Sequence, residues 1–215
     1  LAGEEVLAVE HQLRRGLARH AVGHPVPVRG PPAGGVEVAG IEAGDVHHLR
    51  QGRDHAARGE LSDAIATRLE PVLAGTYDAM TVPGPFSPDA RAAGRRALRL
   101  AALGLLSRRD GGTRAERQFA EADNMTEQLG ALASLLEIGA GEPEVAAFYL
   151  QWGHDRLVLD KWFTLQITRA APDRAVALTG ELADHPDFDW KNPNRFRAVI
   201  GALPANPAGF HDPSG

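Results

Sequence analysis

Residues 143–167 read PEVAAFYLQWGHDRLVLDKWFTLQI, and this stretch decides the fold class. Pro143 suits the first turn of a helix, and large apolar side chains follow at helical spacing as far as Trp152. Residues 153–155 interrupt the pattern, and the apolar spacing then resumes as far as Ile167. The stretch therefore predicts two helices whose link is short enough to make them antiparallel.

Similar patterns extend in both directions from this pair. No strand-like alternation follows residue 60, and no strict repeat period is visible. The sequence therefore predicts an all-α fold, an irregular superhelical stack of antiparallel helix pairs of the α-solenoid, armadillo/HEAT-like kind. Besides the first pair, helices are expected over residues 60–79 (split near Pro71), 88–107, 113–122, 124–138, 172–182 and 195–203, with a further one beginning at Asn206-Pro207.

The predicted helix 88–107 carries residue-level expectations. Ser87 is expected to cap its N-terminus, because a serine followed by proline and an acidic residue is typical of a helix start. Its inner face is expected to consist of Leu98, Ala101, Ala102 and Leu105.

Residues 1–59 differ in composition from the remainder. All 12 aromatic residues lie at Tyr77 or later, whereas six of the nine histidines fall within residues 1–59. The segment 25–35 combines prolines and glycines that exclude a helix interior. Few large apolar side chains are available to offset the entropy of ordering this part. Two interpretations remain open: a poorly structured extension, or an out-of-frame translation product.

Charge and composition exclude several classes of function. The net charge of −5 argues against a nucleic-acid partner, and the lack of cysteine excludes disulfides and thiolate metal sites. No apolar run approaches the roughly 18 residues that would span a bilayer, so no membrane partner is expected. The chain does not open with a signal-peptide pattern. These features predict a cytoplasmic protein.

The sequence contains no catalytic motif that we recognise. It lacks H-E-x-x-H, G-x-S-x-G, the phosphate-binding loop and G-x-G-x-x-G. The histidine cluster at 47, 48 and 55 is better interpreted as a solvated or mistranslated run than as a metal site. The acidic residues on helices, including Asp160 beside Lys161, are expected to serve as caps, solvated faces or ion pairs. We therefore predict no catalytic residue, no metal site and no cofactor in this chain.

The string Asn192-Pro193-Asn194-Arg195-Phe196-Arg197 is the most unusual local sequence. Asn194 can cap the helix that follows the proline, and the two arginines cannot share one helix face. One interpretation is a cap with two surface arginines. The alternative is that one arginine projects into a cavity and meets a carboxylate or a peptide carbonyl.

Five ordered blocks carry a resemblance to a known family. From about Glu60 to its end, the chain resembles the C-terminal helical domain of bacterial-type alanyl aminopeptidase (aminopeptidase N), a zinc metallopeptidase family of the gluzincin class. The blocks are Gly94–Arg99, Ala122–Glu127, Leu157–Gln166, Asn192–Arg197 and Asn206–His211.

The resemblance implies a superhelical domain that closes over a catalytic domain and forms the wall of an enclosed substrate chamber. The family's zinc motif, H-E-x-x-H-x18-E, and its G-x-M-E-N motif are absent from this sequence. The zinc and the catalytic residues are therefore expected in a catalytic domain that this chain lacks. Carried over by position, the substrate-chamber candidates are Arg197 and, with less weight, Arg195, with Asn192 and Asn194 as the loop and cap that aim them.

Three functional hypotheses follow from the sequence. The first divides the chain into a poorly structured or out-of-frame extension, 1–59, and a partial aminopeptidase N C-terminal domain, 60–215, truncated at its end. In that hypothesis the chain is inactive alone, and its partners are the absent catalytic domain and a peptide substrate in the chamber. The second is a stand-alone helical-repeat module that binds a peptide or protein. The third is a non-functional gene remnant.

Overall fold

The computed structural model describes residues 43–212, and the side chains from Gly52 onward. Within this range the chain forms helices and no strand, which confirms the all-α prediction. The elements are α2 (Ala43–Arg68), α3 (Glu70–Ala79), α4 (Ala90–Asp110), α5 (Thr113–Glu121), α6 (Met125–Glu137), α7 (Glu142–Trp152), α8 (Arg156–Arg169), α9 (Pro172–Ala183), α10 (Pro193–Val199), the 3₁₀ helix η1 (Ile200–Ala205) and α11 (Pro207–Phe210).

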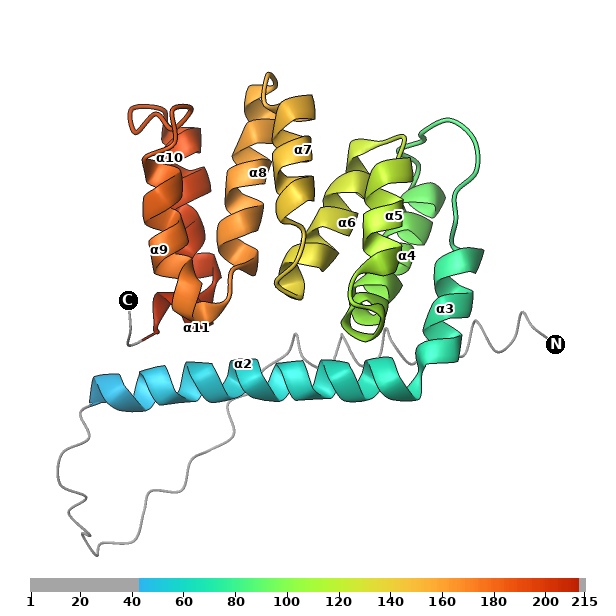
Figure 1. The fold of residues 1–215 in the computed structure, drawn as a ribbon, viewed down its shortest axis with the longest axis horizontal. Helices are drawn as coiled ribbons and strands as arrows, with labels where there is room; N and C mark the ends of the chain where they lie inside the picture. Colours follow the sequence, from blue (N-terminus) through green and yellow to red (C-terminus); the bar gives the residue numbers. More distant parts are fainter. Residues whose placement is uncertain (1–42, 213–215) are drawn as a thin grey trace, which may run out of the picture. The chain divides into compact units, whose positions relative to one another are not determined.

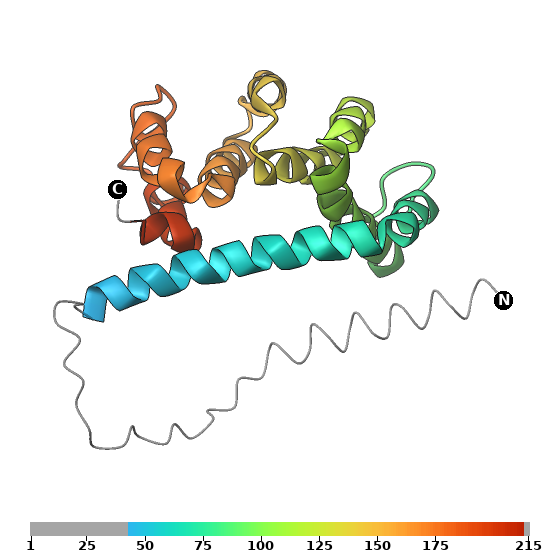
Figure 2. The ribbon, with the colours of Figure 1, turned by 60° about the horizontal axis from the view of Figure 1, so that its bottom comes forward.

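The helices from α3 to α11 form hairpins that lie side by side (Figure 1). Helix α3 packs on α4, α5 on α6, α7 on α8, and α10 on both α8 and η1. Helix α2 runs across one end of the hairpins and packs against α4 and α11 (Figures 1 and 2). The stack of paired helices that the sequence predicts is therefore present in the described residues.

A continuous apolar core joins the hairpins. Phe148 of α7 and Phe163 of α8 are fully buried, as the apolar spacing of residues 143–167 predicts. Each fully buried side chain of this size stabilises the fold by about 1.5–3 kcal/mol. The other large, fully buried apolar residues are Leu103, Leu106, Leu132, Leu135, Ile167 and Val199.

Side-chain caps define where several helices begin. Asp155 Oδ1 accepts hydrogen bonds from the backbone N–H of Leu157 (2.9 Å) and Val158 (3.2 Å), which fixes the start of α8. Asn124 Oδ1 accepts from the N–H of Glu127 at 3.0 Å, so Asn124 caps α6. Such caps stabilise a helix by about 1 kcal/mol.

The start of α2 differs from the sequence-based expectation. The helix begins at Ala43 rather than near Glu60, so residues 43–59 are helical. The described side chains from Gly52 to Arg58 are all exposed, so buried apolar area does not order this part. Extending an existing helix costs far less than nucleating one, so α2 continues upstream although this stretch contains three glycines, Gly44, Gly52 and Gly59. Residues 1–42 lie outside the described range, and the division of the chain at residue 59 stays a prediction.

The N-cap expected for α4 was wrong. Asp89, not Ser87, is the N-cap, because its Oδ1 accepts from the N–H groups of Arg91 and Ala92 at 2.9 Å. Ser87 instead donates its hydroxyl hydrogen to the Asp89 carboxylate.

The inner face of α4 matches the expected one only in part. Ala102 is buried as expected, and Leu98 and Leu105 are half-buried. Ala101 is exposed, whereas Leu103 and Leu106 are fully buried. Arg96 also lies on the buried face of α4, and a pattern based on apolar residues alone does not include it.

Candidate functional site

The string 192–197 forms the start of α10. Asn192 Oδ1 accepts hydrogen bonds from the backbone N–H of Asn194 (3.0 Å) and Arg195 (3.3 Å), so Asn192 caps the helix. The helix begins at Pro193, two residues earlier than expected, and Asn194 lies in its first turn. The expected capping role of Asn194 was therefore wrong, because Pro193 takes the first helical position and leaves the cap to Asn192.

Arg195 points into the molecule and is only 4% exposed. Its Nε donates to Asp160 Oδ1 at 2.6 Å, and its Nη1 donates to the carbonyl oxygen of Asp187 at 2.6 Å. Its Nη2 lies 3.4 Å from the carbonyl oxygen of Arg156, and the guanidinium stands 5.1 Å from the centre of the Phe163 ring. All three nitrogen positions are thus used within the chain, and Arg195 ties α10 to α8.

The expected pairing of Asp160 with Lys161 was wrong. Asp160 turns toward Arg195, and Lys161 is exposed. Consecutive residues of a helix point in different directions, whereas the planar guanidinium of Arg195 reaches the carboxylate from a neighbouring helix.

Asp187 organises the connection between α9 and α10, which we call the 184–192 loop. Its carbonyl oxygen accepts from Arg195, and its carboxylate accepts from the hydroxyl of Tyr149 on α7. Its backbone N–H donates to Nδ1 of His185 at 3.1 Å. The hydrogen bond to the Asp187 carboxylate raises the pKa of Tyr149, because the carboxylate accepts only from the protonated phenol.

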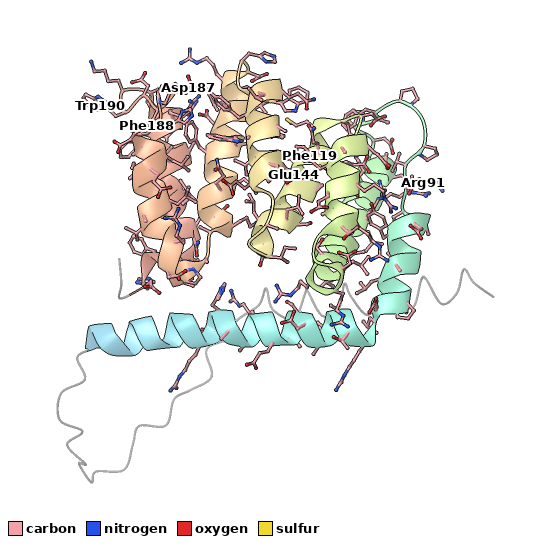
Figure 3. The ribbon with its side chains drawn as sticks, viewed as in Figure 1. Arg91, Phe119, Glu144, Asp187, Phe188 and Trp190 are labelled. Carbon is pink, nitrogen blue, oxygen red and sulfur yellow. The ribbon has the colours of Figure 1, made fainter. Side chains whose placement is uncertain are left out.

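The same loop presents exposed aromatic surface. Trp190 is 69% exposed, with the Lys191 ammonium 5.5 Å from its ring centre. Figure 3 shows Asp187, Phe188 and Trp190 together at one end of α9. Phe188 is half-buried and packs against the core, so it anchors the loop that carries the exposed tryptophan.

Arg197 and Phe196 face outward from α10. Arg197 is exposed, and its Nη1 lies 3.4 Å from Asn194 Oδ1. Phe196 is 45% exposed. The structure thus separates the two arginines: Arg195 is an internal ion-pair partner, and Arg197 is available at the surface.

Sequence reasoning missed the partners that complete this site. Asp160, Asp187, His185 and Tyr149 come from α8, the loop and α7, and no local motif links them. The run DHPDFDWK at residues 184–191 is the one available signal, because it concentrates acidic and aromatic residues between two helices.

A second polar cluster joins α3, α4 and α6. Arg99 Nη1 donates to Glu127 Oε1 at 2.7 Å, and Arg99 Nη2 donates to the Tyr77 hydroxyl at 3.2 Å. The guanidinium also stands 4.5 Å from the centre of the Tyr77 ring. These contacts use Nη1 and Nη2 of Arg99, while its buried Nε has no hydrogen-bond partner. The cluster acts as a structural tie between the first two hairpins.

No metal centre emerges from the described residues. Among the described side chains, residues 52–212, no group of three or more His, Cys, Asp or Glu is placed to hold a metal ion, and His47 and His48 of the histidine cluster lie outside them. These residues therefore do not fit a zinc centre. Among the same residues, no helix is both long and apolar enough to cross a bilayer.

A family model covers most of the chain. The model described as "Domain of unknown function (DUF3458_C) ARM repeats" matches residues 45–215. The match begins upstream of Glu60, where we expected the domain to start, and it includes most of α2.

The chain is also similar to individual aminopeptidases. Aminopeptidase N of Caulobacter vibrioides is 42% identical over 170 residues, which cover 75% of this chain and 19% of that protein. Aminopeptidase N of Escherichia coli is 32% identical over 164 residues, which cover 74% and 19% respectively. The crystal structure of Legionella pneumophila aminopeptidase A in complex with aspartic acid matches with a TM-score of 0.65 at 27% identity, covering 73% of this chain and 20% of that one.

The chain thus spans about one fifth of the length of these relatives. The matched part includes the helical stack. The chain belongs to the ARM-repeat family described as DUF3458_C, and it corresponds to the C-terminal helical domain of aminopeptidase N.

Proposed function

We propose that this chain forms the helical wall of the substrate chamber of a zinc-dependent aminopeptidase and contributes no catalytic group of its own. The observation that carries the proposal is the all-α stack, which matches about one fifth of each of the aminopeptidases above. A wall of packed hairpins excludes water and limits which peptides enter, and both effects shape catalysis without supplying reacting atoms.

The zinc and the catalytic residues belong, in this proposal, to a catalytic domain outside the chain. That domain is the proposed partner, and a peptide in the chamber is the proposed ligand. The described residues of the chain hold no metal group, so no step of the proposal runs through a metal bound by them. We further propose that the protein acts in the cytoplasm, which fractionation of the source cells would test.

Arg197 is the proposed chamber-facing residue. Its side chain is exposed, whereas Arg195 is committed to Asp160 and to backbone carbonyls. Arg195 and Asn192 act as positioning residues, because they fix the start of the helix from which Arg197 projects.

The isolated chain provides the first test. Incubation with alanine p-nitroanilide and added zinc should release no nitroaniline above the blank rate. Clear zinc-dependent turnover would contradict the proposal, because it would place a catalytic centre within this chain.

A chimera provides the second test. The matched segment of Caulobacter vibrioides aminopeptidase N is replaced by this chain, which is 42% identical to it. The chimera should retain aminopeptidase activity, and Arg197→Ala should raise KM for peptides while kcat for the small anilide stays unchanged. Exposed Arg91 offers a matched control, since Arg91→Ala should leave both constants unchanged.

A further inference from the structure

His185 holds the 184–192 loop by accepting a hydrogen bond. Its Nδ1 accepts from the backbone N–H of Asp187 at 3.1 Å. An imidazole nitrogen accepts a hydrogen bond only while it carries no proton. The observed loop conformation therefore uses His185 with Nδ1 unprotonated.

The ring of His185 is enclosed by aromatic side chains. Its centre lies 5.3 Å from that of Tyr149, 5.4 Å from that of Trp162 and 5.4 Å from that of Phe163. Its side chain is 22% exposed, so solvent protons reach it although the ring is packed. The ionisable groups that contact it are Tyr149 on α7 and Asp187 in the loop. Arg195 on α10 bonds to the Asp187 carbonyl oxygen and to Asp160 on α8, and Asp184 is the neighbour of His185 in the sequence.

Protonation reverses the role of Nδ1. The nitrogen then donates, and it can no longer accept from the Asp187 N–H. Oδ2 of the same Asp187 lies 3.9 Å away and offers a negatively charged acceptor. A charge-assisted hydrogen bond is about 2.8 Å long, so the carboxylate and ring must approach by about 1 Å.

We propose that His185 and Asp187 form an acid-sensitive latch. Neutral His185 holds the loop through the Asp187 backbone, and protonated His185 holds it through the Asp187 carboxylate, which shifts the loop. Histidine side chains change charge between about pH 5 and 8. The shift moves the segment that carries exposed Trp190 and the carbonyl that receives Arg195. Acidification would thereby change how this end of the stack presents its aromatic surface.

Two-dimensional ¹H–¹⁵N spectra of the chain between pH 5 and 8 test the latch. The Asp187 amide and the Trp190 indole N–H should shift together in a single transition. His185→Asn should abolish that transition, because the asparagine amide does not titrate. His154→Asn is the matched control, since His154 is exposed in the turn between α7 and α8, and this variant should retain the transition.

Hydrogen exchange gives a second readout. Protection of the Asp187 amide should fall about two- to twelvefold across the transition, the range that one net hydrogen bond supports. No transition in the original chain, or the same transition in folded His185→Asn, overturns the proposal. If His185→Asn does not fold, Asp187→Asn provides the test. A smaller pH-dependent shift of the Trp190 indole N–H in this variant supports the latch, and an unchanged shift overturns it.

Discussion

At the scale of single residues, the ion pair between Arg195 and Asp160 joins α8 to α10. The arginine side chain is 5% exposed and the aspartate side chain 20%. Asp160→Asn preserves the volume but leaves the guanidinium without its counter-charge. Breaking one side of a buried pair is strongly destabilising, so the free energy of unfolding should fall by about 3 kcal/mol in urea denaturation followed by circular dichroism.

An exposed ion pair serves as the control for that prediction. Arg174 and Glu181 on α9 are both more than half exposed. Glu181→Gln should leave the urea midpoint essentially unchanged, because solvent screens surface pairs. Equal losses in the two variants would show that Arg195 has no special structural role.

Local signals predicted a helix cap but missed the partners in the site. The cap at Asn124 follows from nearby sequence, because a cap bonds to residues two or three positions away. The partner of Arg195 lies 35 positions earlier in the chain, so no local pattern could name Asp160. The sequence predicts Asn194 as the cap, whereas Pro193 takes the first helical position and leaves the cap to Asn192.

At the scale of elements, α11 depends on a glycine that touches α9. A Cβ atom built at Gly209 would stand 2.4 Å from the Ala175 Cβ, and neither atom belongs to a flexible side-chain end. Gly209→Ala should therefore force α11 away from α9 and destabilise the chain by about 1–3 kcal/mol. The thermal unfolding midpoint reports the loss.

For a second glycine in the same region, replacement by alanine should increase stability. A Cβ atom at Gly180 in α9 would meet nothing within 4 Å. Gly180→Ala should raise stability by roughly 0.5–1 kcal/mol, because alanine loses less backbone entropy in a helix. A drop in the midpoint for both variants would indicate a general intolerance of α9 rather than the specific contact at Gly209.

The sequence predicted the existence of the hairpins better than their edges and faces. Pro71 separates α2 from α3 as expected, because a proline is tolerated only in the first turn of a helix. Apolar spacing did not predict the whole inner face of α4, because the charged residue Arg96 lies on that face. Its guanidinium is buried and donates a hydrogen bond to the Ser87 carbonyl oxygen at 2.6 Å. The early start of α2 escaped prediction because its described side chains before Gly59 bury nothing.

At the scale of the whole molecule, several exposed carboxylates link stability to acid. A hydrogen bond from Arg108 lowers the pKa of Asp63, one from Ser87 lowers that of Asp89, and one from Arg174 lowers that of Glu181. A lowered folded-state pKa adds stability that is present above the unfolded value and lost as the pH falls through the folded value. The unfolding midpoint should therefore decline below about pH 4.

Asp89→Asn isolates one contribution to this acid response. Asparagine can still cap α4 but does not titrate, so the midpoint should depend less steeply on pH below about 4 than in the original chain. An identical slope in the variant would show that Asp89 does not contribute to the acid response. Thermal melts at half-unit pH steps provide the comparison.

Tyr149 links stability to alkaline pH in the opposite sense. Its pKa is raised in the folded state by the hydrogen bond to Asp187, so its contribution is present below the unfolded value near 10 and is lost as pH rises through the folded value. Tyr149→Phe removes this dependence, and its midpoint should decline less between pH 9 and 11, as followed by far-ultraviolet circular dichroism.

In helix α2, the number of residues is more constrained than their identity. Its C-terminal part buries Ala66 at the hairpins, while its other end lies near α11 (Figures 1 and 2). Between them, residues 52–58 are exposed, so most replacements there should be tolerated. A single inserted residue, however, turns everything upstream by about 100° and advances it by about 1.5 Å. Natural variants of this stretch should therefore differ in amino-acid identity but keep the same number of residues.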